Sequence, residues 1–227
     1  MNLIEQIKGK IIVSSQAMPN EPLYSEECML AMMKSVVNGG ASALRVAGVR
    51  DVRNAKAHFN IPVIGLTKPD KLPENWREVV YITPTLKDVS ELIDAGADII
   101  AFDGTSRERK NSLEDMISEI HKAGRLAMAD IATLDEGINC VSLGADIVST
   151  TLSGYTAESG EAGIDPDYEL LDNLVKSTDK PVILEGRIWE PYQVRKAFEL
   201  GAYAVVIGSA ITRPQLITKR FIEESNI

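Results

Sequence analysis

Short apolar runs recur along the chain, each followed by polar or glycine-containing residues and then by a longer segment with helical spacing. There are eight such runs: IIVSS (11–15), ALRVA (43–47), PVIGLT (62–67), DIIAF (98–102), RLAMA (125–129), ADIVST (145–150), PVILE (181–185) and AVVIG (204–208). Their hydrophobicity is continuous rather than alternating, which is typical of parallel strands buried on both faces. The pattern predicts eight parallel strands that alternate with helices.

Signals for the ends of helices lie between these runs. Three pairs of residues match or imitate a capping box: Thr133 with Glu136, Thr85 with Asp88, and Ser112 with Asp115. Residues expected at the first position of a helix are Pro166, Pro191 and Pro214, and those expected to end one are Gly96, Gly124, Gly144 and Gly201. Three of these glycines belong to a weak repeat, AGAD (95–98), LGAD (143–146) and LGAY (200–203), which indicates duplicated strand–helix units.

The alternation favours a single (β/α)8 barrel, the TIM barrel, formed as one domain over residues 1–227. A further short run, VVYIT (79–83), is interpreted as an excursion in the connection after the third strand. The main alternative is a doubly wound open sheet, which a glycine-rich fingerprint after the first strand would favour. The residues there are SQAMPN, so we prefer the barrel.

The composition, with 44% hydrophobic, 25% charged and 5% aromatic residues, is typical of a globular α/β protein and excludes disordered and collagen-like chains. A net charge of −9 repels nucleic acid at long range, so an anionic metabolite must be held by a few aimed donors. No run is long enough for a membrane span, the N-terminal MNLIEQIKGK lacks the apolar stretch of a signal peptide, and the only cysteines, Cys28 and Cys140, lie in predicted helices. We therefore expect a cytoplasmic protein without membrane contact.

Polar side chains follow four of the predicted strands, all with odd numbers in the barrel: Gln16, Lys68, Asp130 and Glu185. Active sites of such barrels lie at the C-terminal ends of the strands, where side chains from alternate strands share a layer. Lys68 and Glu185 come from strands four apart, so they should face each other across the barrel mouth. A flat intermediate between them would have one ionisable group on each face.

Simpler readings of these residues stay open. Lys68 could begin a solvated loop, and Glu185 could pair with Arg187. Arg45, near the end of the second strand, is a candidate anchor or polariser for substrate oxygens, and its alternative is a structural salt bridge.

A phosphate site is predicted after the seventh and eighth strands. Barrels of this type often bind phosphate there, where glycines allow close backbone approach and a helix N-terminus offers free amides. The expected ligands are Gly186, Arg187, Gly208, Ser209 and Arg213, of which the two arginines would add charge-assisted hydrogen bonds.

Two further features carry less chemistry. His58 and His121 are distant in sequence and lack partners at ligand spacing, so the sequence predicts no metal site. The glycine-rich stretch at residues 151–165 is longer than a typical connection of this kind, and it is either a lid or an idle loop.

Taken together, the segments IVSSQA, ALRVAGV, IGLTKPD, YITPT, MADIAT, TTLSGYT, ILEGRI and GAYAVVIGSAITRP resemble the N-acetylmannosamine-6-phosphate 2-epimerases of bacterial sialic acid catabolism. The resemblance implies a TIM barrel that uses no metal or other cofactor and inverts C2 of N-acetylmannosamine 6-phosphate to give N-acetylglucosamine 6-phosphate. It also implies roles for matching residues: Lys68 and Glu185 as the acid/base pair, Gln16, Arg45 and Asp130 as substrate ligands, and Arg213 as a phosphate ligand.

The chain departs from the family pattern at a few positions. Ser15 stands where the family often has cysteine, Gly104 stands in an otherwise usual Asp-Ala-Thr, and Pro69 stands where a basic residue is common. These departures leave every expected catalytic group in place and concern the edges of the sugar pocket.

Two other functions fit the same residues. A desolvated Lys68 amine could add to a carbonyl as the Schiff-base nucleophile of a sugar-phosphate aldolase. A catalytically silent barrel that senses a sugar phosphate would explain the phosphate loops but not a lysine and a glutamate opposed across the mouth. A homodimer is expected from the frequency of symmetric pairing among such proteins.

Overall fold

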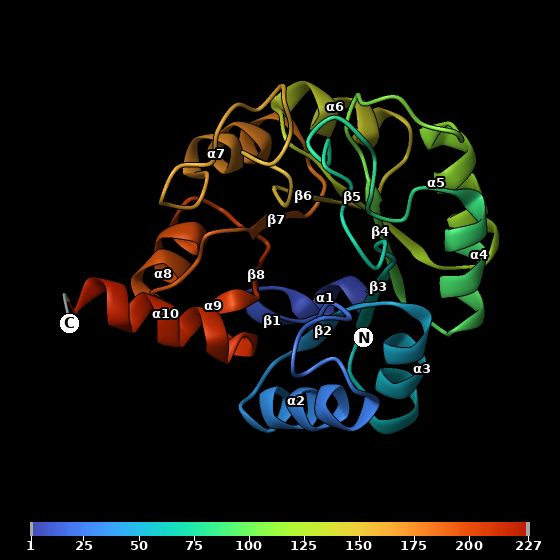
Figure 1. The fold of residues 1–227 in the computed structure, drawn as a ribbon. Coiled ribbons are helices and arrows are strands. Elements are labelled where there is room, and N and C mark those ends of the chain that lie inside the picture. Colours follow the sequence, from blue (N-terminus) through green and yellow to red (C-terminus); the bar gives the residue numbers. More distant parts are fainter. Residues whose placement is uncertain (1, 226–227) are drawn as a thin grey trace.

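The computed structural model describes residues 2–225, so both ends of the predicted domain, residue 1 and residues 226–227, lie outside the described part. Eight parallel strands close into a barrel in the order β1 to β8, with β8 paired to β1. Figure 1 shows the helices as an outer ring around these strands. The strands are β1 (Lys10–Ser15), β2 (Ala43–Ala47), β3 (Val63–Leu66), β4 (Ile99–Asp103), β5 (Leu126–Asp130), β6 (Ile147–Ser149), β7 (Val182–Glu185) and β8 (Ala204–Ile207). The predicted TIM barrel is therefore confirmed.

Helices connect successive strands and two more follow β8 (Figure 1). They are α1 (Leu3–Ile7), α2 (Glu26–Asn38), α3 (Val49–His58), α4 (Leu86–Asp94), α5 (Leu113–Lys122), α6 (Leu134–Ser142), α7 (Tyr168–Ser177), α8 (Pro191–Glu199), α9 (Ser209–Thr212) and α10 (Pro214–Glu224). None of the helices within residues 2–225 is both long and apolar enough to cross a membrane.

Two layers of apolar side chains stabilise the barrel. The inner layer fills its centre with residues such as Ile12, Ile64 and Met128, and Ile7 of α1 joins it from below. The outer layer lies between the strands and the surrounding helices and includes Leu44 and Phe102. The barrel is thus a packed core rather than a pore, and in this fold the active site lies at the C-terminal mouth.

Most of the predicted helix signals are confirmed. Thr85 and Thr133 form complete capping boxes, and the Ser112 hydroxyl caps α5. Pro191 and Pro214 occupy the first turn of α8 and α10. Pro166 was expected at the first position of a helix, but that prediction is wrong. Asp167 takes the N-cap position of α7 instead, because its carboxylate accepts the amide of residue 170.

The region of residues 79–83 forms no strand, as expected for an excursion. The repeat also has a structural role at the opposite end of the barrel. Asp98 accepts the backbone amide of Val63 at 2.9 Å, and Asp146 accepts that of Ala127 at 2.8 Å. Each aspartate therefore joins the start of its strand to the preceding odd-numbered strand.

Candidate active site

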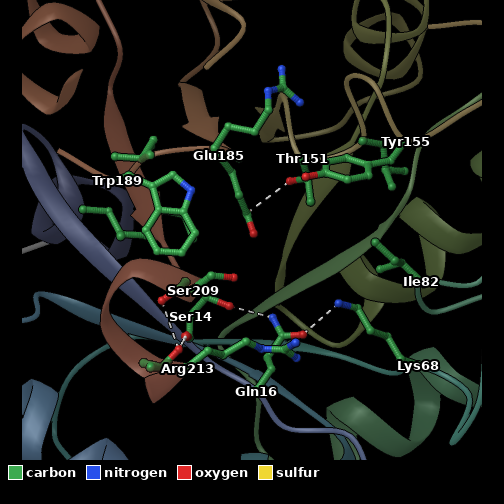
Figure 2. A pocket seen from close by; sticks show the side chains of 18 of the residues that line it. Ser14, Gln16, Lys68, Ile82, Thr151, Tyr155, Glu185, Trp189, Ser209 and Arg213 are labelled. Carbon is green, nitrogen blue, oxygen red and sulfur yellow. Dashed lines mark hydrogen bonds between the residues drawn. The ribbon is translucent and has the colours of Figure 1, made fainter. Parts of the chain in front are cut away.

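A cavity of about 400 Å³ opens at the C-terminal mouth of the barrel. Its lining residues come from both halves of the chain (Figure 2). Predicted site residues that line it are Gln16, Lys68, Glu185, Gly186, Arg187, Gly208, Ser209 and Arg213. Arg45 and Asp130 are not among the lining residues, since their side chains are 1% and 0% exposed.

Lys68 lies two residues after β3, and its side chain extends into the cavity toward β1 (Figure 2). Its ammonium nitrogen donates to Gln16 Oε1 at 2.9 Å, and Gln16 Nε2 donates in turn to Ser14 Oγ at 2.8 Å. Because an ammonium group only donates, the Lys68 contact defines that the amide oxygen of Gln16 faces the lysine, and the Ser14 hydroxyl accepts from the other end. Lys68 is therefore held in place by two hydrogen-bonded side chains, Gln16 and Ser14, at the end of β1, and it does not stand in a solvated loop.

Glu185 is the last residue of β7, and its carboxylate enters the cavity from the side opposite Lys68 (Figure 2). Within the described residues, the two groups form no ion pair, while each has its own set of partners. Burial, and then the nearby Arg45 charge, lowers the pKa of Lys68 to about 8. Burial raises the pKa of Glu185 above its usual range, although the Arg45 charge opposes this rise. The two groups are thus brought closer in proton affinity.

A buried ion pair lies beneath the cavity floor. The Arg45 guanidinium donates to both carboxylate oxygens of Asp130, at 3.2 Å and 2.6 Å, and its Nε lies 3.2 Å from Glu185 Oε2. This forked geometry fixes Asp130 and sets a positive charge next to Glu185. Sequence reasoning considered both a substrate anchor and a salt bridge for Arg45, and the structure shows the salt bridge.

The turn after β7 and the start of α9 form one end of the cavity. Gly186 has φ 110° and Arg187 has φ 58°, so the chain turns sharply there in a conformation that a non-glycine residue rarely adopts. Among residues 2–225, the backbone amides of Gly186, Arg187, Gly208 and Ser209 have no acceptor. These four residues all line the cavity, as does Arg213, whose Nη1 lies 2.9 Å from Glu21 Oε1.

Arg187 contacts the loop of residues 151–165 rather than Glu185. Its guanidinium donates to the carbonyl of Asp165 at 2.7 Å and to that of Ser153 at 2.6 Å, and it lies 5.9 Å from the centre of the Tyr155 ring. The loop therefore has a defined position over the cavity, with Tyr155 in the wall (Figure 2).

Some lining residues were missed by sequence reasoning. Thr151 lies two residues beyond β6 and contacts both Asp130 and Glu185. Ser14 supports Gln16, and aromatic side chains from three connections add to the wall: Tyr81, Tyr155 and Trp189. The position of Thr151 after a buried strand was available as a signal. The aromatic residues gave none, because they lie in connections whose path depends on the folded barrel.

Comparisons with known proteins identify the family of the chain. Residues 29–226 match the family model described as "Putative N-acetylmannosamine-6-phosphate epimerase". A protein of Clostridium perfringens strain 13 is 47% identical, over 97% of this chain and 99% of its own length. Its name is "Putative N-acetylmannosamine-6-phosphate 2-epimerase". A similarly named protein of Clostridioides difficile strain 630 is 44% identical, over 99% of this chain and 100% of its own length.

Solved structures give the same picture. The N-acetylmannosamine-6-phosphate 2-epimerase from Clostridium perfringens has a TM-score of 0.93 at 46% identity, covering 99% of this chain and 96% of that one. The tryptophan synthase alpha-subunit from Pyrococcus furiosus has a TM-score of 0.66 at 15% identity, covering 97% and 99%, and shows the shared fold alone. With this extent of similarity, the chain belongs to the N-acetylmannosamine-6-phosphate 2-epimerase family.

Proposed function

We propose that this protein interconverts N-acetylmannosamine 6-phosphate and N-acetylglucosamine 6-phosphate by moving a proton at C2. The observation that carries the proposal is the placement of Lys68 and Glu185 at opposite sides of one cavity, from strands four apart in the barrel. The family relationship supplies the substrate, because its members are named for this reaction. In inversion by direct proton transfer, a proton leaves one face of C2 and another returns to the opposite face, and this pair supplies an ionisable group on each side.

The chemistry begins with opening of the sugar ring, because a free aldehyde at C1 makes the C2 hydrogen acidic. A base removes the C2 proton, and the electrons of the C–H bond form an enolate with its negative charge on the C1 oxygen. An acid then returns a proton to C2 from the opposite face, and the carbonyl is regenerated. In one direction neutral Lys68 is the base and protonated Glu185 is the acid, and in the other the roles are exchanged.

Both directions therefore use a pair that holds one proton in total. With two protons there is no base, and with none there is no acid. The singly protonated pair exists in two forms, one with both groups charged and one with both neutral. The lowered pKa of Lys68, about 8, and the raised pKa of Glu185 increase the fraction of the form with neutral Lys68 and protonated Glu185. Burial is the main cause of both shifts, so exclusion of water by the substrate would increase them.

The phosphate is held at the end of the cavity formed by the turns after β7 and β8. Unpaired amides of Gly186, Arg187, Gly208 and Ser209 favour an anion there, and the Arg213 guanidinium adds charge. Glu185 immediately precedes this cradle, so anchoring the phosphate fixes the distance from the sugar to the carboxylate. Arg213 would exchange its contact with Glu21 for the phosphate.

Arg45 and Asp130 act from beneath the floor. Neither residue lines the cavity, so the residues above them would have to move before either could contact the substrate. In their present positions, their charges act on Glu185. The Arg45 charge favours the carboxylate form of Glu185 and the neutral form of Lys68. Gln16 lines the cavity and can contact both Lys68 and a substrate hydroxyl.

The proposal is tested by incubating the protein with N-acetylmannosamine 6-phosphate and measuring the gluco epimer by NMR. The expected result is approach to the same equilibrium mixture from either epimer. Unphosphorylated N-acetylmannosamine is the matched control and should react far more slowly, because it lacks the anchored group. A protein that binds the sugar phosphate tightly but leaves it unchanged would instead be the sensor considered above.

The lowered pKa of Lys68 also suits the Schiff-base aldolase. Borohydride added during turnover separates the two chemistries. A substrate adduct at Lys68 together with carbon–carbon cleavage would support the aldolase, while C2 inversion without an adduct supports the epimerase.

The remaining expectations are a cytoplasmic location and a homodimer. Support for pairing comes from exposed apolar side chains on α8, α9 and α10, namely Tyr192, Ile211, Phe221 and Ile222. Light scattering of the purified protein measures the oligomeric state directly, and a monomer at all concentrations would contradict it.

A further inference from the structure

The Thr151 hydroxyl lies at the meeting point of the two carboxylates of the site. Its oxygen is 2.7 Å from Asp130 Oδ1, 3.1 Å from Glu185 Oε2 and 2.9 Å from Ser149 Oγ. Figure 2 shows Thr151 directed at the Glu185 carboxylate from the start of the loop over the cavity. The distances to both carboxylates are within hydrogen-bond range, yet a hydroxyl has only one proton to donate.

The arrangement can satisfy Glu185 in both protonation states. Asp130 accepts two hydrogen bonds from Arg45 and is paired as a carboxylate, so it can only accept from Thr151. When Glu185 is ionised, the hydroxyl proton of Thr151 can turn toward it. When Glu185 is protonated, its own proton can be donated to the Thr151 oxygen while the Thr151 proton turns to Asp130. Apart from the proton that Glu185 gains or loses, only the hydroxyl hydrogen of Thr151 moves between the two arrangements.

We propose that Thr151 is a positioning residue that keeps the Glu185 carboxyl in one place while it gains and loses the proton of the epimerisation. The inference rests on the proposed function, because it assumes that Glu185 changes its protonation during turnover. Without Thr151, the protonated form would lose its acceptor at this oxygen, and the ionised form would keep only Arg45 Nε, at 3.2 Å. An unpartnered buried polar group is costly, so the carboxyl would reorient between steps.

The role of Thr151 can be separated from that of its neighbour. Thr150 fixes the backbone of Glu185, since its hydroxyl accepts the Glu185 amide at 3.1 Å and donates to the Glu185 carbonyl at 3.1 Å. Loss of the Thr151 hydroxyl therefore leaves the Glu185 backbone held by Thr150 and removes only side-chain contacts, to Glu185, Asp130 and Ser149. The charged groups that face Glu185 are Arg45, Asp130 and Lys68. Of these, only Asp130 loses a hydrogen bond with the Thr151 hydroxyl, and it keeps both of its bonds from Arg45.

The test is the pH profile of the C2 hydrogen exchange rate for Thr151→Val, which keeps the branched shape and removes the hydroxyl. The hydrogen bond that Thr151 donates to the ionised carboxylate is charge-assisted and stronger than the one its oxygen accepts from the protonated form, so it lowers the pKa of Glu185. Its loss should therefore move the acidic limb of the profile to higher pH, by about 0.5 to 1 unit. We also expect kcat to fall more than KM changes. Thr151→Ser should return the limb to the wild-type position.

Thr105→Val is the matched control, because the Thr105 hydroxyl also donates to a buried carboxylate, Asp103, at 2.6 Å, but Thr105 does not line the cavity. It should change stability without moving the limb. If Thr151→Val does not fold, Thr151→Ala removes the same hydroxyl with less steric demand. A limb that stays at the wild-type pH in the folded variant would overturn the inference. A wild-type protein without C2 exchange would instead contradict the proposed function itself.

Discussion

Lys68 follows strand β3 by two residues and Glu185 ends strand β7, four positions away in the closed barrel, and both side chains line one cavity of about 400 Å³. They do not pair with each other. Lys68 donates to Gln16, and Glu185 lies beside Arg45 and Thr151, so the space between the two groups is left for a substrate.

The plot of kcat/KM against pH should be bell-shaped, because the active pair holds a single proton. Above a pH of about 8, Lys68 loses its proton while Glu185 is ionised, and no acid remains. Below the raised pKa of Glu185 both groups are protonated, and no base remains. We expect the same two limbs for kcat/KM in both directions, measured with each epimer as substrate. A profile that stays flat through pH 8 would show that Lys68 does not exchange the proton.

Removal of Arg213 should affect binding of the phosphorylated substrate. For Arg213→Ala we expect KM to rise about 10- to 100-fold, since a hydrogen bond to a charged group contributes roughly 1.5–3 kcal/mol. Arg195→Ala is the control, because Arg195 is exposed on α8 and does not line the cavity. Steady-state kinetics with N-acetylmannosamine 6-phosphate measure both. An unchanged KM in Arg213→Ala would remove this residue from the phosphate site.

The ion pair beneath the floor should matter for stability as well as rate. Arg45→Met leaves Asp130 buried without its partner, which we expect to lower the free energy of unfolding by about 3–5 kcal/mol. Lys87→Ala breaks a surface pair with Glu91 and should cost no more than about 0.5 kcal/mol. Urea denaturation of the three proteins compares them. Equal losses in the two variants would contradict the role assigned to the buried pair.

Arg187 should control the loop over the cavity. Arg187→Ala removes two hydrogen bonds to carbonyls of residues 153 and 165, so amide hydrogen exchange in residues 153–165 should become about tenfold faster. Arg53→Ala, an exposed substitution on α3, should leave that exchange unchanged. If the loop exchanges at the wild-type rate without Arg187, other contacts determine its position.

Much of the barrel could be predicted from the sequence, because a strand buried on both faces needs a continuous apolar run and the connecting helices carry their own start and end signals. All eight runs became strands within one or two residues of the expected bounds. The error at Pro166 had a local cause, since Asp167 competes for the cap of α7. The short helices α1 and α9 carried no periodic signal, because each is a single turn.

The site was predictable only in part. Strand parity placed Lys68 and Glu185 across the mouth, and the structure brings both to the cavity. Parity could not show depth, so it did not separate Gln16 in the wall from Asp130 beneath the floor. It also could not show that the Arg187 guanidinium contacts the carbonyl of Asp165, which lies 22 residues earlier in the chain. Such contacts depend on how connections fold over the mouth, which no local pattern specifies.

The central claim is that Lys68 and Glu185 exchange a proton at C2, and it is tested most directly by an NMR time course with N-acetylmannosamine 6-phosphate in deuterated water. We expect deuterium to enter C2 as the gluco epimer appears. Lys68→Ala should slow this exchange by about 100- to 10,000-fold, the usual contribution of an acid/base group. Lys71→Ala, an exposed lysine in the same connection, should behave as wild type. Epimerisation that proceeds without deuterium at C2, or at the wild-type rate in Lys68→Ala, would contradict the claim.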